Sequence, residues 1–156
     1  MAEDDLLTAA TGGIVVGLDD SPSARVALRH ALREGVRRDT HVLALAVYHS
    51  QAAWAPQVAK VLDEDRIVGE VGKAVQRVVD EVVAEERERG NDVPRVRAGL
   101  RTGSPADVLS RVSQQAQLLV VGDRGRGALA SRLIGSVVLG VVLNAHCPVL
   151  VVHPTD

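Results

Sequence analysis

The residues best suited to chemistry lie in a glycine-rich segment that runs from Gly122 to Ser136. Glycine lets the backbone turn sharply and approach a ligand closely. The segment ends where a helix is expected to begin, and free backbone N–H groups at such a start, here on Gly135, Ser136 and Val137, bind anions. The Ser136 hydroxyl can bond to a phosphate oxygen or can cap its own helix. The segment therefore predicts an anion site of the kind that holds phosphate groups.

Three other nucleotide or phosphoryl signatures fit the chain less well. A Walker-type P-loop is excluded because Gly-x-x-x-x-Gly-Lys-Ser/Thr does not occur. Residues 125–130 match Gly-x-Gly-x-x-Ala, but no acidic residue follows about twenty positions later, which disfavours a Rossmann dinucleotide site. Asp19 and Asp20 could belong to a phospho-accepting receiver, yet the third expected strand ends without an aspartate and the fifth has no lysine.

Composition narrows the classes of protein further. The 156 residues include 18 Lys and Arg against 20 Asp and Glu, with no basic block, so a nucleic-acid partner is not expected. The 28 valines, beside one Trp, one Tyr and no Phe, favour a sheet packed on both faces. Cys147 is the single cysteine, and the acidic start lacks a signal-peptide profile, so we expect a cytoplasmic protein. The longest nearly apolar stretch, residues 133–143, is too short to cross a membrane.

The elements that must position the glycine-rich segment alternate between strand and helix patterns. Apolar runs predict strands at residues 14–18, 41–47, 95–100, 118–121 and 149–152. Serine caps, proline starts and apolar stripes predict helices at about 22–35, 68–90, 105–112 and 136–145. Residues 48–65 show no period and are expected to form a loop, and residues 1–12 are expected to be a flexible segment.

This order predicts an α/β fold, with residues 13–156 as one three-layer domain whose parallel sheet has helices on both faces. In such sheets ligands bind beyond the carboxyl ends of the strands, where the winding direction reverses. The strand ends with unusual chemistry are those at Asp19 and Gly122. If these two strands are neighbours, their ends flank one site.

The glycine spacing resembles that of a known family. The chain contains the pattern Gly-x2-Gly-x9-Gly-Ser/Thr, formed by Gly122, Gly125, Gly135 and Ser136. In this it resembles the nucleotide-binding branch of the universal stress proteins. Val-Gly-Leu-Asp-Asp-Ser at 16–21 and Cys-Pro-Val-Leu-Val-Val at 147–152 look like the family's first and last strands. The resemblance covers about residues 13–153. It implies a five-stranded sheet in the order 3-2-1-4-5, of the Rossmann-like or adenine nucleotide alpha hydrolase-like type.

The resemblance also implies a ligand, ATP with magnesium, and the residues that hold it. The nucleoside would lie against strand ends, contributed by Gly17, Leu18, Asp19, Val47, Val121 and Gly122. The phosphates would lie against the glycine-rich loop and the helix start, contributed by Arg124, Gly125, Gly135, Ser136 and Val137. Asp20 and Asp123 depart from the family pattern, and carboxylates beside a triphosphate repel it unless they face solvent, contact an arginine or hold magnesium.

Two functions follow from this interpretation. In the first, the protein is an ATP-binding regulator of the response to stress or growth arrest, and its nucleotide state determines its binding to an unidentified protein partner. In the alternative, a dimeric interaction module keeps the same fold without binding nucleotide. Enzymatic activity would be at most slow ATP hydrolysis, since the sequence shows no base that could orient a water molecule. The apolar strand at 149–152 would lie at the sheet edge, which predicts a homodimer, also the habit of the family.

Overall fold

The computed structural model describes residues 2–19, 21–49, 64–124 and 134–154. Five parallel strands form one sheet in the order β3-β2-β1-β4-β5, which confirms the predicted order. The strands are β1 (Ile14–Leu18), β2 (Val42–Tyr48), β3 (Val96–Thr102), β4 (Leu118–Gly122) and β5 (Val149–Val152). Each agrees within two residues with the apolar run that predicted it.

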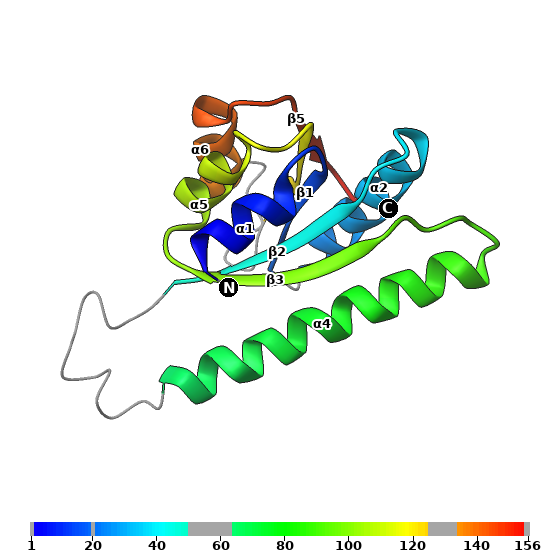
Figure 1. Cartoon of the computed structure of the whole chain (residues 1–156), viewed down its shortest axis with the longest axis horizontal. Coiled ribbons are helices and arrows are strands. Elements are labelled where there is room, and N and C mark those ends of the chain that lie inside the picture. The colour runs from blue at the N-terminus through cyan, green and yellow to red at the C-terminus, as the bar shows by residue number, and fades with distance from the viewer. Residues whose placement is uncertain (1, 20, 50–63, 125–133, 155–156) are drawn as a thin grey trace.

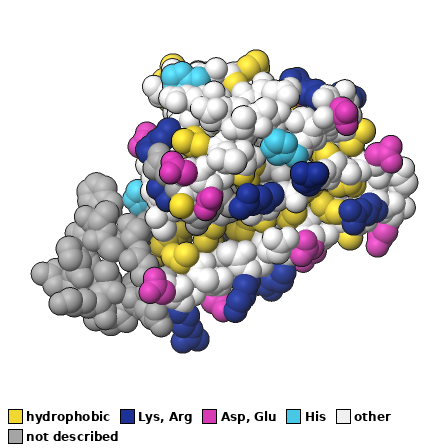
Figure 2. Space-filling model, in the orientation of Figure 1, with side chains coloured by type: hydrophobic (Ala, Val, Ile, Leu, Met, Phe, Trp, Pro, Cys, Tyr) yellow, Lys and Arg dark blue, Asp and Glu magenta, His cyan; other side chains and the backbone are white. Residues whose placement is uncertain are grey.

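Helices cover both faces of the sheet, so the molecule has three layers (Figure 1). On one face lie α2 (Pro22–Arg37) and the long α4 (Glu64–Glu88). On the other lie α1 (Glu3–Ala10), α5 (Pro105–Val112) and α6 (Ser136–Asn144). Figure 2 shows acidic and basic side chains intermixed along the lower edge of that view, where α4 lies.

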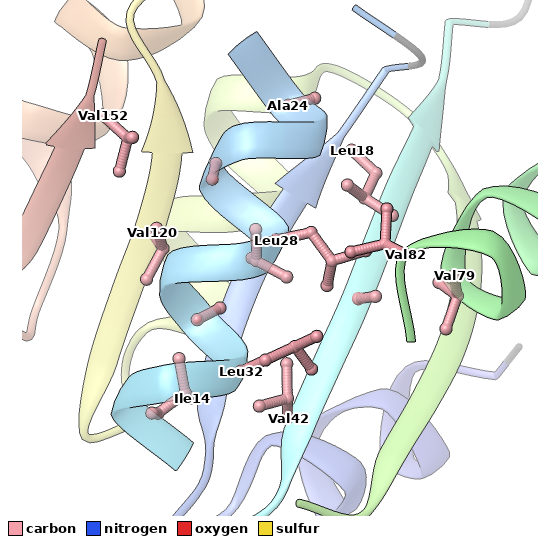
Figure 3. Close-up of a cluster of buried hydrophobic side chains, with 14 of the residues drawn as sticks. Ile14, Leu18, Ala24, Leu28, Leu32, Val42, Val79, Val82, Val120 and Val152 are labelled. Carbon is pink, nitrogen blue, oxygen red and sulfur yellow. The ribbon is translucent and has the colours of Figure 1, made fainter. Parts of the chain in front are cut away.

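Each face of the sheet has its own apolar core, because successive residues of a strand point to opposite sides. In Figure 3, Leu32 projects from α2 toward Val42 of β2, and Leu28 of α2 and Ile14 of β1 belong to the same cluster. Val15 of β1 belongs to the other core, beneath α1, α5 and α6. The inner strands are therefore apolar at nearly every position, which accounts for the many valines.

The first residues differ from the expectation of a flexible segment. Residues 3–10 form α1, and the side chains of Leu6 and Ala10 are fully buried in the second core. His41 Nε2 lies 2.9 Å from the carbonyl oxygen of Ala9, and the Thr40 hydroxyl donates to the carbonyl of Gly12 at 2.8 Å. These contacts attach α1 to the start of β2, so the segment before β1 is part of the folded structure.

The helix starts confirm one of the expected serine caps. Ser21 Oγ accepts a hydrogen bond from the backbone N–H of Ala24 at 3.1 Å, with Pro22 at the first helical position. Ser104 holds the same position before α5, but its side chain makes no capping bond. Among the described residues, no helix is both long and apolar enough to span a membrane.

Charged side chains join α2 to α4 along their outer edges. Arg25 pairs with Glu81 at 2.7 Å, and Arg29 pairs with Glu85. Glu86 is 1% exposed and bonds to Asn91 and Arg89, both at 2.7 Å. Burial on its own raises the pKa of Glu86, but these bonds and the charges of Arg33 and Arg89 outweigh it and hold the pKa below its usual value.

Candidate functional site

A cleft of about 320 Å³ opens at the carboxyl edge of the sheet, between the ends of β1 and β4. These strands are hydrogen-bonded neighbours, with Ile14 opposite Leu118 and Val16 opposite Val120. After β1 the chain crosses toward β2, and after β4 it crosses toward β5, so the winding direction reverses at this point. The cleft therefore occupies the position where parallel α/β sheets bind ligands.

Ten of the eleven residues selected from the sequence line this cleft. They are Gly17, Leu18, Asp19, Val47, Val121, Gly122, Arg124, Gly135, Ser136 and Val137. Gly125 lies outside the described residues. The structure thus gathers segments from three strand ends and one helix start around a single cavity.

Sequence reasoning missed five residues that also line the cleft: Ala24, Leu45, Pro105, Leu109 and Val138. Two of them follow a simple pattern that could have identified them. Leu45 precedes Val47 by two positions on β2 and so points to the same face, and Val138 lies in the first turn of α6, directly after Val137. Pro105 and Leu109 belong to α5, and no local sequence motif indicates that this helix lies beside the cleft.

The cleft combines an apolar interior with polar groups. Leu45, Leu109, Val121 and Val138 are buried apolar side chains in its wall. Asp19, Arg124 and Ser136 supply its carboxylate, its guanidinium and its hydroxyl. Such a cavity suits a ligand with one flat, weakly polar end and one charged end.

Asp19 shapes the entry to α2 as well as the cleft. Its Oδ1 accepts a hydrogen bond from the backbone N–H of Ser21 at 3.1 Å. This turn, followed by the Ser21 cap, directs the chain from β1 into α2. The carboxylate is only partly buried and lies at the cleft, where it can accept from hydroxyl groups of a ligand. Asp20 is outside the described residues.

Gly122 is required for helix packing, in addition to lining the cleft. A Cβ atom at this position would lie 2.6 Å from Ser23 Cβ and 2.8 Å from the Ser23 carbonyl carbon. The sequence interpretation ascribed this glycine to a sharp turn of the backbone and the close approach of a ligand. The structure shows instead that α2 packs so closely on β4 that no side chain fits between them.

The start of α6 differs from its predicted form. Gly135, and not Ser136, occupies the N-cap position, and Ser136 is the first helical residue with an exposed side chain. The Gly135 N–H is not free, because it donates to the carbonyl oxygen of Asp123 at 3.1 Å. Ser136 and Val137 hold the first two helical positions, where N–H groups have no acceptor within the helix. Of the three predicted N–H donors, these two are therefore the ones that the helix start leaves available for an anion.

Asp123 does not face the cleft, although Gly122 and Arg124 on either side of it do. Its side chain is buried, with Oδ1 accepting from Ser23 Oγ at 2.8 Å. Oδ2 lies 3.0 Å from His153 Nδ1 and 3.2 Å from Arg124 Nε. Burial raises the pKa of Asp123, but the bonds from His153, Ser23 and Arg124 outweigh it and lower the pKa below its usual value. Of the arrangements under which this carboxylate would not repel a triphosphate, the structure shows the contact with an arginine, Arg124.

Within the described parts of the chain, no three His, Cys, Asp or Glu side chains converge as a metal site. The chemistry available in the cleft is hydrogen bonding and charge, from Asp19, Arg124, Ser136 and the backbone. This arrangement can hold and orient a small anionic ligand.

Comparison with known proteins agrees with this geometry. A universal stress protein of Mycobacterium tuberculosis H37Rv is 34% identical over 149 residues, which cover 92% of this chain and 48% of that protein. A universal stress protein of Mycolicibacterium smegmatis is 36% identical over 141 residues, with 90% and 45% covered. The chain thus spans about half the length of these curated relatives.

A solved structure shares the fold over nearly its whole length. The crystal structure of a universal stress protein in complex with cAMP matches with a TM-score of 0.62 and 25% identity, covering 92% of this chain and 98% of that one. The model of the universal stress protein family matches residues 12–153. That range contains all five strands and the cleft between them, and the chain belongs to the universal stress protein family.

Proposed function

We propose that the cleft binds an adenine nucleotide, ATP with magnesium, and that the chain acts as a nucleotide-dependent regulator of a stress or growth-arrest response. The observation that carries the proposal is the cleft itself, at the switch point of the sheet, with the N-terminus of α6 in its wall. The family membership and the related protein in complex with cAMP support it.

The lining residues divide into two groups that fit the two ends of a nucleotide. The apolar side chains of Leu45, Leu109 and Val121, with the main chain of Val47, suit the base, and Asp19 suits the hydroxyl groups of ribose. The guanidinium of Arg124 and the N–H groups of Ser136 and Val137 suit the phosphates. Gly125 would join the phosphate side in our proposal, and magnesium would accompany the triphosphate.

A regulatory role would use the surface of α6. This helix begins at the cleft, and three apolar side chains on it are exposed, namely Leu139, Val142 and Leu143. Bound phosphates at its first turn would fix the helix start and thereby the apolar surface that a protein partner meets. The same helix packs beside the edge strand β5, so we propose a cytoplasmic homodimer formed through Val149–Val152 and α6.

A charge introduced at the helix start tests the proposed phosphate position. Ser136→Glu places a carboxylate where the helix dipole favours negative charge, so the fold should persist while phosphates are repelled. We expect calorimetric titration to show ATP binding weakened about tenfold or more, because like charges about 4 Å apart at a protein surface cost about 4 kcal/mol, against about 1.4 kcal/mol for a tenfold change. The neutral variant Ser136→Gln, of the same size, should bind within about threefold of the wild type. Equal affinity of the glutamate variant and the wild type would contradict a phosphate site at α6.

The nucleotide-free interaction module remains the second candidate function. Arg124 is the single cationic side chain among the described residues that line the cleft, which favours this candidate over a tight triphosphate site. A wild-type protein that shows no ATP binding at millimolar concentration, but still forms a dimer, would establish it in place of the regulator.

A further inference from the structure

Asp123 lies at a junction between the cleft and three elements of the fold. Its N–H donates to the carbonyl oxygen of Val152 in β5 at 2.9 Å. Its carbonyl oxygen accepts from the N–H of Gly135, the cap of α6, at 3.1 Å. Since Arg124 follows Asp123 and Ile134 precedes Gly135, these bonds hold the two ends of the glycine-rich segment together. Backbone hydrogen bonds of Asp123 thus fix the points where the glycine-rich segment leaves β4 and enters α6.

The carboxylate of Asp123 fixes a side chain of the cleft in addition. Oδ1 is occupied by the Ser23 hydroxyl, and Oδ2 is shared by Arg124 Nε and His153 Nδ1. Asp123 is 6% exposed, whereas the side chain of Arg124 is 46% exposed and lines the cleft. The buried carboxylate of Asp123 therefore accepts a hydrogen bond from Arg124, whose side chain lines the cavity.

The contact between Asp123 and Arg124 uses only Nε of the guanidinium and leaves its two Nη groups for other acceptors. Asp123 engages Nε, and within the described residues Arg124 has no hydrogen bond from either Nη atom. Because guanidinium donors are arranged as a rigid fork, fixing Nε also fixes the directions of the Nη donors. An anion in the cleft could take both of them without breaking the bond to Asp123.

We propose that Asp123 is a positioning residue, which holds Arg124 by Nε so that its Nη groups meet the phosphates of the nucleotide. The assignment rests on the proposed function of the cleft. It gives a role to one of the two aspartates by which the chain departs from the family pattern. The negative charge of Asp123 does not oppose the ligand, because Ser23, His153 and Arg124 surround it and it points out of the cleft.

A double-mutant cycle on the full chain tests the assignment, with ATP and uncharged adenosine as probes. Arg124→Ala should weaken ATP binding about tenfold and leave adenosine binding unchanged, since a charged hydrogen bond is lost. Asp123→Asn keeps the size of the side chain and should weaken ATP binding about threefold through the loosened arginine. In the Arg124→Ala background, Asp123→Asn should have no further effect on ATP binding.

Two further variants separate positioning from net charge and from folding. Arg95→Ala removes the same charge from an exposed site at the opposite edge of the sheet, and ATP binding should be unchanged. Arg124→Lys keeps the charge but lacks the fork, so Asp123→Asn should have no effect in that background either. Thermal unfolding of each variant reports any loss of structure independently of ligand.

The possible outcomes are distinct. Tighter ATP binding by Asp123→Asn would show that its carboxylate repels the ligand, which would overturn the assignment. Equal effects of Asp123→Asn with and without Arg124 would also overturn it, because the role of Asp123 would then be structural. If the wild type binds no ATP, both the proposed function and the role of Asp123 are wrong. If the wild type binds ATP but the effects of Asp123→Asn and Arg124→Ala are additive, only the role of Asp123 is wrong.

Discussion

At the scale of single residues, the cleft depends on positions whose importance comes from packing as much as from ligand contact. Gly122 is the clearest of these, because the family resemblance placed it beside the nucleoside while its surroundings leave no room for a side chain. Asp123 is the second, since its carboxylate serves the interior of the fold and Arg124 rather than the cavity. A shared motif therefore does not by itself say which of its residues touch the ligand.

Alanine at Gly122 should be strongly destabilising even without ligand. The added Cβ would lie within 2.8 Å of the Ser23 backbone, so α2 must shift relative to β4. We expect a loss of about 1–3 kcal/mol, the range for overpacked cores, in chemical denaturation. Gly69→Ala is the matched control: a Cβ there meets nothing within 4 Å in α4, and alanine should stabilise the helix by about 0.5–1 kcal/mol. A Gly122→Ala protein as stable as the wild type would refute the packing role.

At the scale of elements, two sets of contacts stabilise the fold without being visible as sequence motifs. They are the packing of α1 on the sheet and the ion pairs between α2 and α4. The helix α1 covers β2 on the α5 side of the sheet through Leu6 and Ala10. The ion pairs between α2 and α4 join the two helices that lie on the same face of the sheet, and the buried Glu86 of α4 takes part in them through Arg29 and Arg33. These contacts stabilise the frame on which β1 and β2 present their strand ends to the cleft.

The contribution of Glu86 should depend on pH in a defined direction. Its pKa is lower in the folded state than the value of about 4.3 in the unfolded chain. Its ionised form therefore adds stability above about pH 4.3, and this stability is lost as the pH falls through the lower folded pKa. Urea unfolding should show Glu86→Gln destabilised by about 1–3 kcal/mol at pH 7, with the difference shrinking below about pH 4.

The control for this prediction is Glu88→Gln, a change of an exposed glutamate in the last turn of α4. Its difference from the wild type should be small at every pH. A Glu86→Gln deficit that is the same at pH 7 and below pH 4 would contradict the proposed role of the ionised carboxylate.

At the scale of the whole molecule, the proposed homodimer follows from the exposed edge at β5 and the apolar surface of α6. Light scattering at micromolar concentration should give twice the mass of the 16.5 kDa chain. Leu143→Glu should give a monomer, because Leu143 is 72% exposed on α6 and a buried carboxylate would be unpaired there. Val36→Glu is the control, since Val36 is also exposed but lies at the end of α2, on the face of the sheet opposite α6, and this variant should stay dimeric. A wild-type monomer would contradict the interface.

The sequence predicted most of this architecture, for identifiable reasons. The strands are apolar runs buried on both faces, so runs such as Ile14–Leu18 and Val149–Val152 mark them directly. The cleft residues stand at strand ends and at a helix start, which the topology brings together. The helix α1 could not be predicted, because the burial of Leu6 depends on a face of β2 that lies far along the chain. The surroundings of Asp123 were equally hidden, since Ser23 precedes it by 100 residues and His153 follows it by 30.

The central claim is that the cleft between β1 and β4 binds an adenine nucleotide. The most direct measurement is calorimetric titration of the wild-type protein with ATP and magnesium, after unfolding and refolding to remove any bound molecule and identification of that molecule by mass spectrometry. The account predicts saturable binding of one ATP per chain and an adenine nucleotide among the released molecules. No binding at millimolar ATP, together with no released nucleotide, would contradict it.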